Sequence, residues 1–131
     1  MAAFSDIVMH HFLHPRGTGP MPSPTGEGWA GSLETSRTMR IQVRVADGQV
    51  LDARFATYGC APAIAAGNWL CEWVMGRPVA EAQAMSADRL NDELGGLPES
   101  RRFCANLAVD ALHHALSKAL ANTQNHEVRT P

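Results

Sequence analysis

The chain has 131 residues, 45% of them hydrophobic, which is enough for one ordinary domain with a buried core. Its formal net charge of -2 at pH 7, without a stripe of Lys and Arg, argues against nucleic acid as the main partner. No apolar run reaches membrane-spanning length, no secretion signal opens the chain, and three cysteines make no disulfide framework. We therefore expect a cytoplasmic protein with reduced thiols and no membrane contact.

The first predicted element is a short helix over residues 5–13. Ser5 or Asp6 can cap it, and apolar residues recur along it before a proline ends it. His10 and His14 are four residues apart on this helix, a spacing that can hold a metal ion. Because no Cys or carboxylate lies at a matching interval, we interpret them as solvated surface histidines.

A surface loop and a β-hairpin follow. Residues 16–31 are dense in Gly and Pro, which predicts a loop. Residues 38–45 alternate strictly between apolar and polar side chains, and alternation returns in the stretch that ends at Tyr58. Asp47 and Gly48 between them form a dipeptide typical of tight turns. These patterns predict two antiparallel strands with one apolar face.

Cys60 lies where the second of these strands gives way to a helix. Gly59 breaks the alternation, and apolar residues then recur at helical intervals until about Gly76. Free backbone N–H groups and the positive end of the helix dipole would stabilise a Cys60 thiolate there. A small buried hydrophobe is the alternative interpretation, with similar weight. Cys71, about 16 Å further along the helix, is too distant to share a site and is interpreted as packing.

The last part of the chain is predicted to be helical. Residues 78–85 and 87–94 form two short helices, and from Ser100 onward one long amphipathic helix packs its apolar stripe on the sheet. Residues 122–131 are polar and unpatterned, so we expect a frayed end there, and another in residues 1–3.

Cys104 lies near the start of this long helix, shortly after Arg101 and Arg102. The helix dipole and the two guanidinium groups favour a thiolate at Cys104. The same residue belongs to the apolar stripe, and burial there would disfavour the charged form. The sequence leaves a reactive thiol and a packing residue as equal interpretations.

Three segments together resemble the NifU/IscU family of iron–sulfur cluster scaffold proteins: SDIVMHHFLHPR, MRIQVRVADGQVLDARFATYGCAPAIAAGNWLCEWVMGRPVAEAQ and LGGLPESRRFCANLAVDAL. The patterns DARF…YGC and LP…C..LA.DAL fall at the family's spacing with small length changes. The resemblance implies a single α+β domain over residues 1–131. Such a domain has a small antiparallel β-sheet of about three strands, α-helices packed on one face, and a long C-terminal helix (IscU/SufE-like).

The resemblance also implies a site at one tip of the sheet. In the family, three cysteines, an aspartate and a histidine gather there, bind zinc or a nascent cluster, and receive sulfur as a persulfide from a cysteine desulfurase. The second and third of these cysteines match Cys60 and Cys104. The first cysteine falls on Thr35, the aspartate on Arg37 and the histidine on Phe103.

Two further family positions differ. The chaperone-binding Leu-Pro-Pro-Val-Lys segment falls on residues 97–101, which read L-P-E-S-R, and the N-terminal tyrosine falls on Phe4. The resemblance therefore implies an Hsp70-type chaperone system as a partner, through a segment that has changed.

The substitutions change what the site can bind. Zinc in a closed site takes four ligands, so two thiolates and a hydroxyl make zinc binding by a monomer unfavourable. A 2Fe–2S cluster normally takes four thiolates, which two protomers could supply as Cys60 and Cys104 from each. Arg37 in place of a carboxylate would attract anions such as a thiolate or a persulfide.

We expect an iron–sulfur cluster assembly scaffold-like protein rather than a turnover enzyme. It would bind a cluster, bridged between protomers of a homo-oligomer, or carry sulfur with Cys60 as persulfide acceptor. A cysteine desulfurase, a chaperone and a recipient iron–sulfur protein are the expected partners. The alternative is a metal-free adaptor or regulator that docks on the same partners. A thiol–disulfide couple between Cys60 and Cys104 is allowed if their Cα atoms lie within about 7 Å.

Overall fold

The computed structural model describes residues 4–32, 34–35 and 37–129, with side chains as far as Asn122. In chain order the elements are α1 (Asp6–Leu13), β1 (Gly26–Ser32), β2 (Arg37–Ala46), β3 (Gln49–Tyr58), α2 (Ala61–Val74), α3 (Val79–Gln83), α4 (Ala87–Glu93), the 3-10 helix η1 (Glu99–Arg101) and α5 (Phe103–Arg129). The predicted residues 1–3 and 130–131 of the frayed ends lie outside the described residues.

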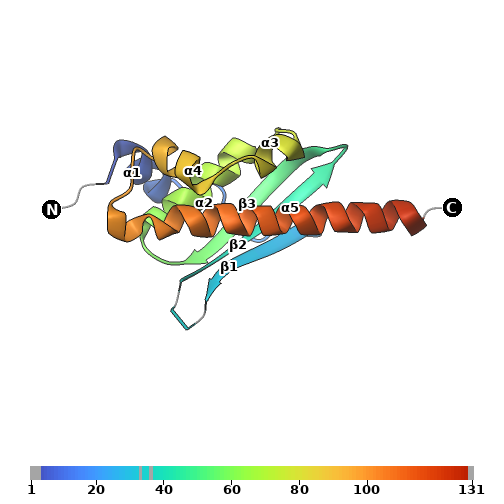
Figure 1. The fold of residues 1–131 in the computed structure, drawn as a ribbon, viewed down its shortest axis with the longest axis horizontal. Helices are drawn as coiled ribbons and strands as arrows, with labels where there is room; N and C mark the ends of the chain where they lie inside the picture. Colours follow the sequence, from blue (N-terminus) through green and yellow to red (C-terminus); the bar gives the residue numbers. More distant parts are fainter. Residues whose placement is uncertain (1–3, 33, 36, 130–131) are drawn as a thin grey trace.

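The strands form one antiparallel sheet in the order β1-β2-β3, and the helices lie on one of its faces (Figure 1). Helix α5 packs on β1 and β2, and α2 packs on β3. Helices α1, α3 and α4 pack in turn on α2 or α5. The α+β fold with a three-stranded sheet and a long C-terminal helix is therefore confirmed.

The hairpin between β2 and β3 forms where the sequence predicts it. Its turn residues Asp47 and Gly48 have φ of 53° and 74°, values that suit glycine and that asparagine or aspartate tolerates. The apolar side chains of both strands face the helices, where Ile41, Phe55 and their neighbours form the core with α2 and α5. The alternating pattern thus fixes which face of the sheet is covered.

Strand β1 is a correction to the sequence-based prediction, which treats residues 16–31 as loop. Its inward positions include Gly26 and Gly28, so the strand lacks the alternating apolar side chains that would reveal it. A Cβ at Gly28 would overlap the backbone of α5 at Ala111 and Ala115. Glycine is therefore the residue that allows α5 to lie directly on β1.

Both edges of the sheet carry hydrogen bonds to neighbouring segments. On the β1 edge, the backbone N–H of Trp29 donates to Nδ1 of His114 on α5, with 3.1 Å between the two nitrogens. On the β3 edge, the backbone N–H of Phe55 donates to the Gly17 carbonyl at 2.8 Å. Helix α5 thus borders the β1 edge, and the loop before β1 borders the β3 edge.

A buried asparagine joins the N-terminal segment to α2. The Asn68 side chain is fully buried, and its amide nitrogen lies 2.7 Å from Nδ1 of His11 and 2.7 Å from a carboxylate oxygen of Glu72. Its oxygen accepts a hydrogen bond from the backbone N–H of Gly17 at 2.8 Å. Burial lowers the pKa of His11, an effect that Glu72 opposes and His10 reinforces.

The histidines of α1 and the end of α5 complete the fold. The His10 and His14 rings lie side by side, with 5.0 Å between their centroids. Among the described residues, no group of three or more His, Cys, Asp or Glu side chains could hold a metal ion.

Helix α5 continues to Arg129, past the point where its apolar pattern stops, and extends beyond the sheet (Figure 1). Within the described residues, no helix has the length and hydrophobicity needed to cross a bilayer.

Candidate functional site

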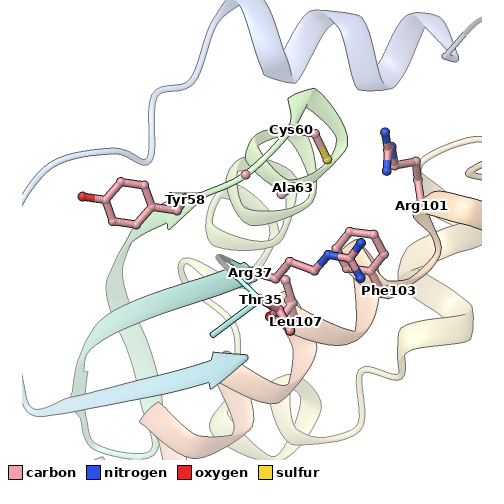
Figure 2. Close-up of a pocket in the computed structure, with 9 residues that line it drawn as sticks. Thr35, Arg37, Tyr58, Cys60, Ala63, Arg101, Phe103 and Leu107 are labelled. Atoms are coloured by element: carbon pink, nitrogen blue, oxygen red, sulfur yellow. The ribbon is translucent and has the colours of Figure 1, made fainter. Parts of the chain in front are cut away.

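A cavity of about 200 Å³ lies where β2 and α2 begin, β3 ends, and η1 leads into α5 (Figure 2). The antiparallel register brings the start of β2 beside the end of β3, and both helices begin at the same end of the sheet. The residues that line this cavity, here called the tip cavity, are Thr35, Arg37, Tyr58, Gly59, Cys60, Ala63, Arg101, Phe103 and Leu107.

Cys60 is the N-cap residue of α2, as the break at Gly59 predicts. Its backbone is extended, with φ of -88° and ψ of 176°, and its carbonyl accepts the first hydrogen bonds of the helix. The side chain makes no capping hydrogen bond, and it is only partly buried. The sulfur of Cys60 is therefore not occupied by the helix and is directed into the tip cavity (Figure 2).

Cys104 lies directly behind Cys60. It is the second residue of α5, has no exposed surface, and places its Sγ 3.7 Å from Sγ of Cys60. Burial, and to a smaller extent the nearby Cys60 sulfur, raise the pKa of Cys104 to about 12, although Arg101 and Arg37 oppose the shift. The sequence leaves a reactive thiol and a packing residue as interpretations of Cys104. In the structure, the effect of burial on its pKa is larger than the stabilisation of the thiolate by the two arginines.

Arg37 and Phe103 form a stacked pair in the wall of the tip cavity. The guanidinium carbon of Arg37, at the start of β2, lies 4.2 Å from the centroid of the Phe103 ring (Figure 2). This cation–π contact holds the exposed charge of Arg37 in place at the cavity. Arg101 places a second positive charge in the cavity wall. Among the described residues that line the cavity, none carries a carboxylate and two carry guanidinium groups, so the lining favours anions.

Thr35 also lines the tip cavity and is exposed. Its hydroxyl donates a hydrogen bond to the carbonyl of Ser32 at 3.1 Å. The hydroxyl is thus engaged with the backbone, and a neutral hydroxyl is a weaker metal ligand than a thiolate.

The structure brings together all five residues that sequence reasoning assigns to the site, with Cys104 beneath the surface of the cavity. It adds two that the reasoning does not assign to it. Arg101 lines the cavity from η1, and Tyr58 lies at its rim with 75% of its surface exposed, its ring turned away from the other side chains (Figure 2). Their adjacency to the matched motifs around Cys60 and Cys104 is the signal that could have found them.

Cys71 stays apart from this site. It is 1% exposed in the core, and burial raises its pKa. All three cysteines of the chain are free thiols in the structure. Cys71 therefore offers a matched control for experiments on the other two.

Comparisons with known proteins agree on one family. The family model of the NifU-like N terminal domain matches residues 3–126. The iron–sulfur cluster assembly scaffold protein IscU of Escherichia coli K12 is 37% identical over 119 residues, which cover 88% of this chain and 92% of that protein. IscU 1 of Archaeoglobus fulgidus is 37% identical over 113 residues, covering 86% and 74%.

Solved structures show the same fold. The N-terminal NifU-like protein of Brucella abortus superposes with a TM-score of 0.72 over 89% of this chain and 94% of that one, at 18% identity. The putative iron–sulfur cluster assembly scaffold protein for the SUF system of Fervidobacterium islandicum AW-1 gives a TM-score of 0.69 at 18% identity, covering 86% of this chain and 96% of that one.

Proposed function

Because the chain belongs to the family of the NifU-like N-terminal domain, we propose that it is an iron–sulfur cluster assembly protein of the scaffold type that handles sulfur through Cys60 and Cys104. Its relatives are named as iron–sulfur cluster assembly scaffolds, and the likeness extends over most of their length. The cluster would be cargo, built or passed on, and the protein would work in the cytoplasm.

The observation that carries this proposal is the pair of sulfurs 3.7 Å apart beside two guanidinium groups. A persulfide is an anion at neutral pH, and the cavity around Cys60 has Arg37 and Arg101 to attract it. Cys60 is also the one member of the pair that lines the cavity. We therefore assign sulfur uptake to Cys60, with a cysteine desulfurase as the donor.

A second candidate function, cluster binding between two copies, is favoured by the same distance. Two thiolates on one tetrahedral metal ion with bonds of about 2.3 Å lie about 3.8 Å apart. Cys60 and Cys104 have nearly this spacing, at 3.7 Å. One chain would supply two thiolates and a second copy the other two of a 2Fe–2S cluster, once Cys104 had lost its proton.

A chaperone partner belongs to the proposal as well. Residues 97–101 lead directly from α4 to the site, and Arg101 within them lines the tip cavity. Leu97 is 7% exposed, and its backbone N–H donates to the side chain of Asn91 at 3.0 Å. An Hsp70-type partner would therefore bind the exposed end of this segment rather than its leucine.

Sulfur transfer from a cysteine desulfurase tests the main proposal. The protein is incubated anaerobically with the desulfurase, pyridoxal phosphate and cysteine, and the sulfur added to each peptide is located by mass spectrometry. We expect the wild type and Cys71→Ala to gain sulfur at Cys60, counted as bound persulfide or as the sulfide passed on from it, and Cys104→Ala to retain the sulfur on Cys60. Cys60→Ser should gain none.

Equal sulfur loading of Cys60→Ser and the wild type would contradict the assignment. If Cys104→Ala acquires no sulfur either, while the desulfurase loads a family scaffold in a parallel reaction, the sulfur-carrying function itself is wrong.

A further inference from the structure

We propose that Cys104 releases the sulfur carried by Cys60 as sulfide, by forming a disulfide with Cys60. The inference rests on the proposed uptake of sulfur at Cys60, and it adds a step that this chain's own thiols perform. Iron–sulfur clusters contain sulfide, whereas the outer sulfur of a persulfide must first gain two electrons. The pair in the tip cavity can supply them.

The two thiols have unequal access. Cys60 lines the tip cavity and is partly buried, whereas Cys104 has no exposed surface and lies behind it. A sulfur donor can therefore reach Cys60 without reaching Cys104. The buried thiol is placed to act after the delivery, on the Cys60 sulfur that faces it.

The geometry needs only a small movement. The sulfurs are 3.7 Å apart, and a disulfide bond is about 2.0 Å long, so closure requires a shift of about 1.7 Å. Cys60 is the N-cap residue of α2, its side chain makes no capping hydrogen bond, and Gly59 precedes it. Rotation of the Cys60 side chain can supply the shift while Cys104 stays fixed in the core.

The charges of the tip cavity favour the step. The departing hydrosulfide is an anion, and Arg37 and Arg101 line the cavity into which it leaves. The same two guanidinium groups favour the thiolate of Cys104 behind the cavity. The contact with Phe103 holds the guanidinium of Arg37 in place, 4.2 Å from the ring centroid. Figure 2 shows the Cys60 sulfur directed toward the space between Arg101 and this stacked pair, which gives the hydrosulfide a way out.

The step balances without an outside reagent. The thiolate of Cys104 attacks Sγ of Cys60, the bond between that Sγ and the outer sulfur breaks, and its electron pair leaves with the outer sulfur. The proton that Cys104 gives up goes to this outer sulfur, which leaves as hydrosulfide. The two cysteine sulfurs are oxidised to a disulfide, and the outer sulfur is reduced to sulfide.

The product needs a reductant before the next cycle. A protein dithiol reductant would restore both thiols by thiol–disulfide exchange at the partly exposed Cys60 sulfur. Until then the pair can neither accept sulfur nor bind iron. Each release would therefore block further delivery until the reductant had acted.

Chemical loading of the sulfur tests this step without a partner enzyme. Sodium polysulfide is added anaerobically to the full chain, excess reagent is removed by gel filtration, and released sulfide, persulfide and disulfide are measured by colorimetry and mass spectrometry. We expect the wild type and Cys71→Ala to release one sulfide per loaded persulfide and to contain a Cys60–Cys104 disulfide. Cys104→Ala should keep the persulfide on Cys60, with sulfide release at background.

Two outcomes would overturn the inference, and they differ in what else they affect. If the wild type keeps its persulfide as long as Cys104→Ala does, the release step is wrong and sulfur uptake at Cys60 stands. If Cys104→Ala acquires no persulfide while folded by circular dichroism, both the release step and the proposed function fail. Cys104→Ser provides a second test of the same kind should the alanine variant not fold.

Discussion

The thiol of Cys104 is separated from solvent by the thiol it contacts, and this arrangement assigns different chemistry to two identical side chains. Cys60 faces the tip cavity, whereas Cys104 lies in an apolar environment that keeps it protonated. Arg37 and Phe103 stack on each other at the two positions where the family resemblance leads us to expect a carboxylate and an imidazole. The contact places a positive charge at the cavity instead.

Differential alkylation measures this inequality. In the native protein at pH 8, iodoacetamide should modify Cys60 at least tenfold faster than Cys104 or Cys71. The reason is that a pKa of about 12 leaves roughly one Cys104 in ten thousand as thiolate at that pH, in addition to its burial. The rate at Cys104 should rise as pH increases toward 12. Modification of Cys104 at the rate of Cys60 at pH 8 would contradict the arrangement described.

Among the elements, β1 depends most on a partner distant in sequence. Its glycines let the backbone of α5 approach, and Trp29 in β1 hydrogen-bonds His114, 85 residues later in the chain. By contrast, α1 is joined to α2 by a buried amide as well as by apolar packing at Val8, because Asn68 links His11 to Glu72 and the loop. These two contacts give separate predictions for stability.

Replacing Gly28 by alanine should lower the free energy of unfolding by about 1–3 kcal/mol, because the new Cβ would overlap the backbone of α5. Gly48→Ala is the control: its Cβ would meet nothing within 4 Å, so it reports only the cost of a positive φ, roughly 1 kcal/mol. Urea unfolding of both variants checks this. A Gly28→Ala protein as stable as the wild type would mean that α5 does not lie on β1 as described.

The stability of the protein should decrease as pH falls below about 6.5. Burial lowers the pKa of His11 in the folded state, so the unfolded chain takes up a proton at a pH where the folded one does not. Protonation at Nδ1 would also remove the acceptor that the Asn68 amide faces at 2.7 Å. Urea midpoints measured from pH 7.5 to 5 should show a smaller decrease in His11→Asn than in the wild type.

The matched control for that series is His14→Asn, because His14 is exposed at the end of the same helix and does not contribute to the shift in the pKa of His11. It should retain the pH dependence of the wild type. If His11→Asn retains it as well, the buried contact with Asn68 is not its source.

For the whole molecule, the sequence predicts the elements whose signals are local. The hairpin follows from alternation and an Asp-Gly turn, and helix α1 follows from its cap, Ser5, which accepts a hydrogen bond from the backbone of Val8. Strand β1 was missed because its identity depends on α5 rather than on its own side chains. The meeting of Cys60 and Cys104, 44 residues apart, follows only from the family resemblance, since neither residue carries a local signal of the other.

Anaerobic reconstitution with ferrous iron and sulfide tests cluster binding between copies. We expect visible absorption to elute from gel filtration with a dimer, and to be lost in Cys60→Ser and in Cys104→Ala, because each copy would supply half of the thiolates. Cys71→Ala should behave like the wild type. Absorption that elutes with the monomer would contradict shared ligation.

The hydrogen bonds at the two sheet edges limit how two copies can meet. Trp29 donates its backbone N–H to His114, and Phe55 donates its own to Gly17, so each edge strand is already hydrogen-bonded at one position that an added strand would need. Growth by strand addition, the usual route from an open sheet to fibrils, is thereby discouraged. A second copy that approaches the end of the sheet where β2 begins and β3 ends would instead meet the tip cavity and the sulfur pair there.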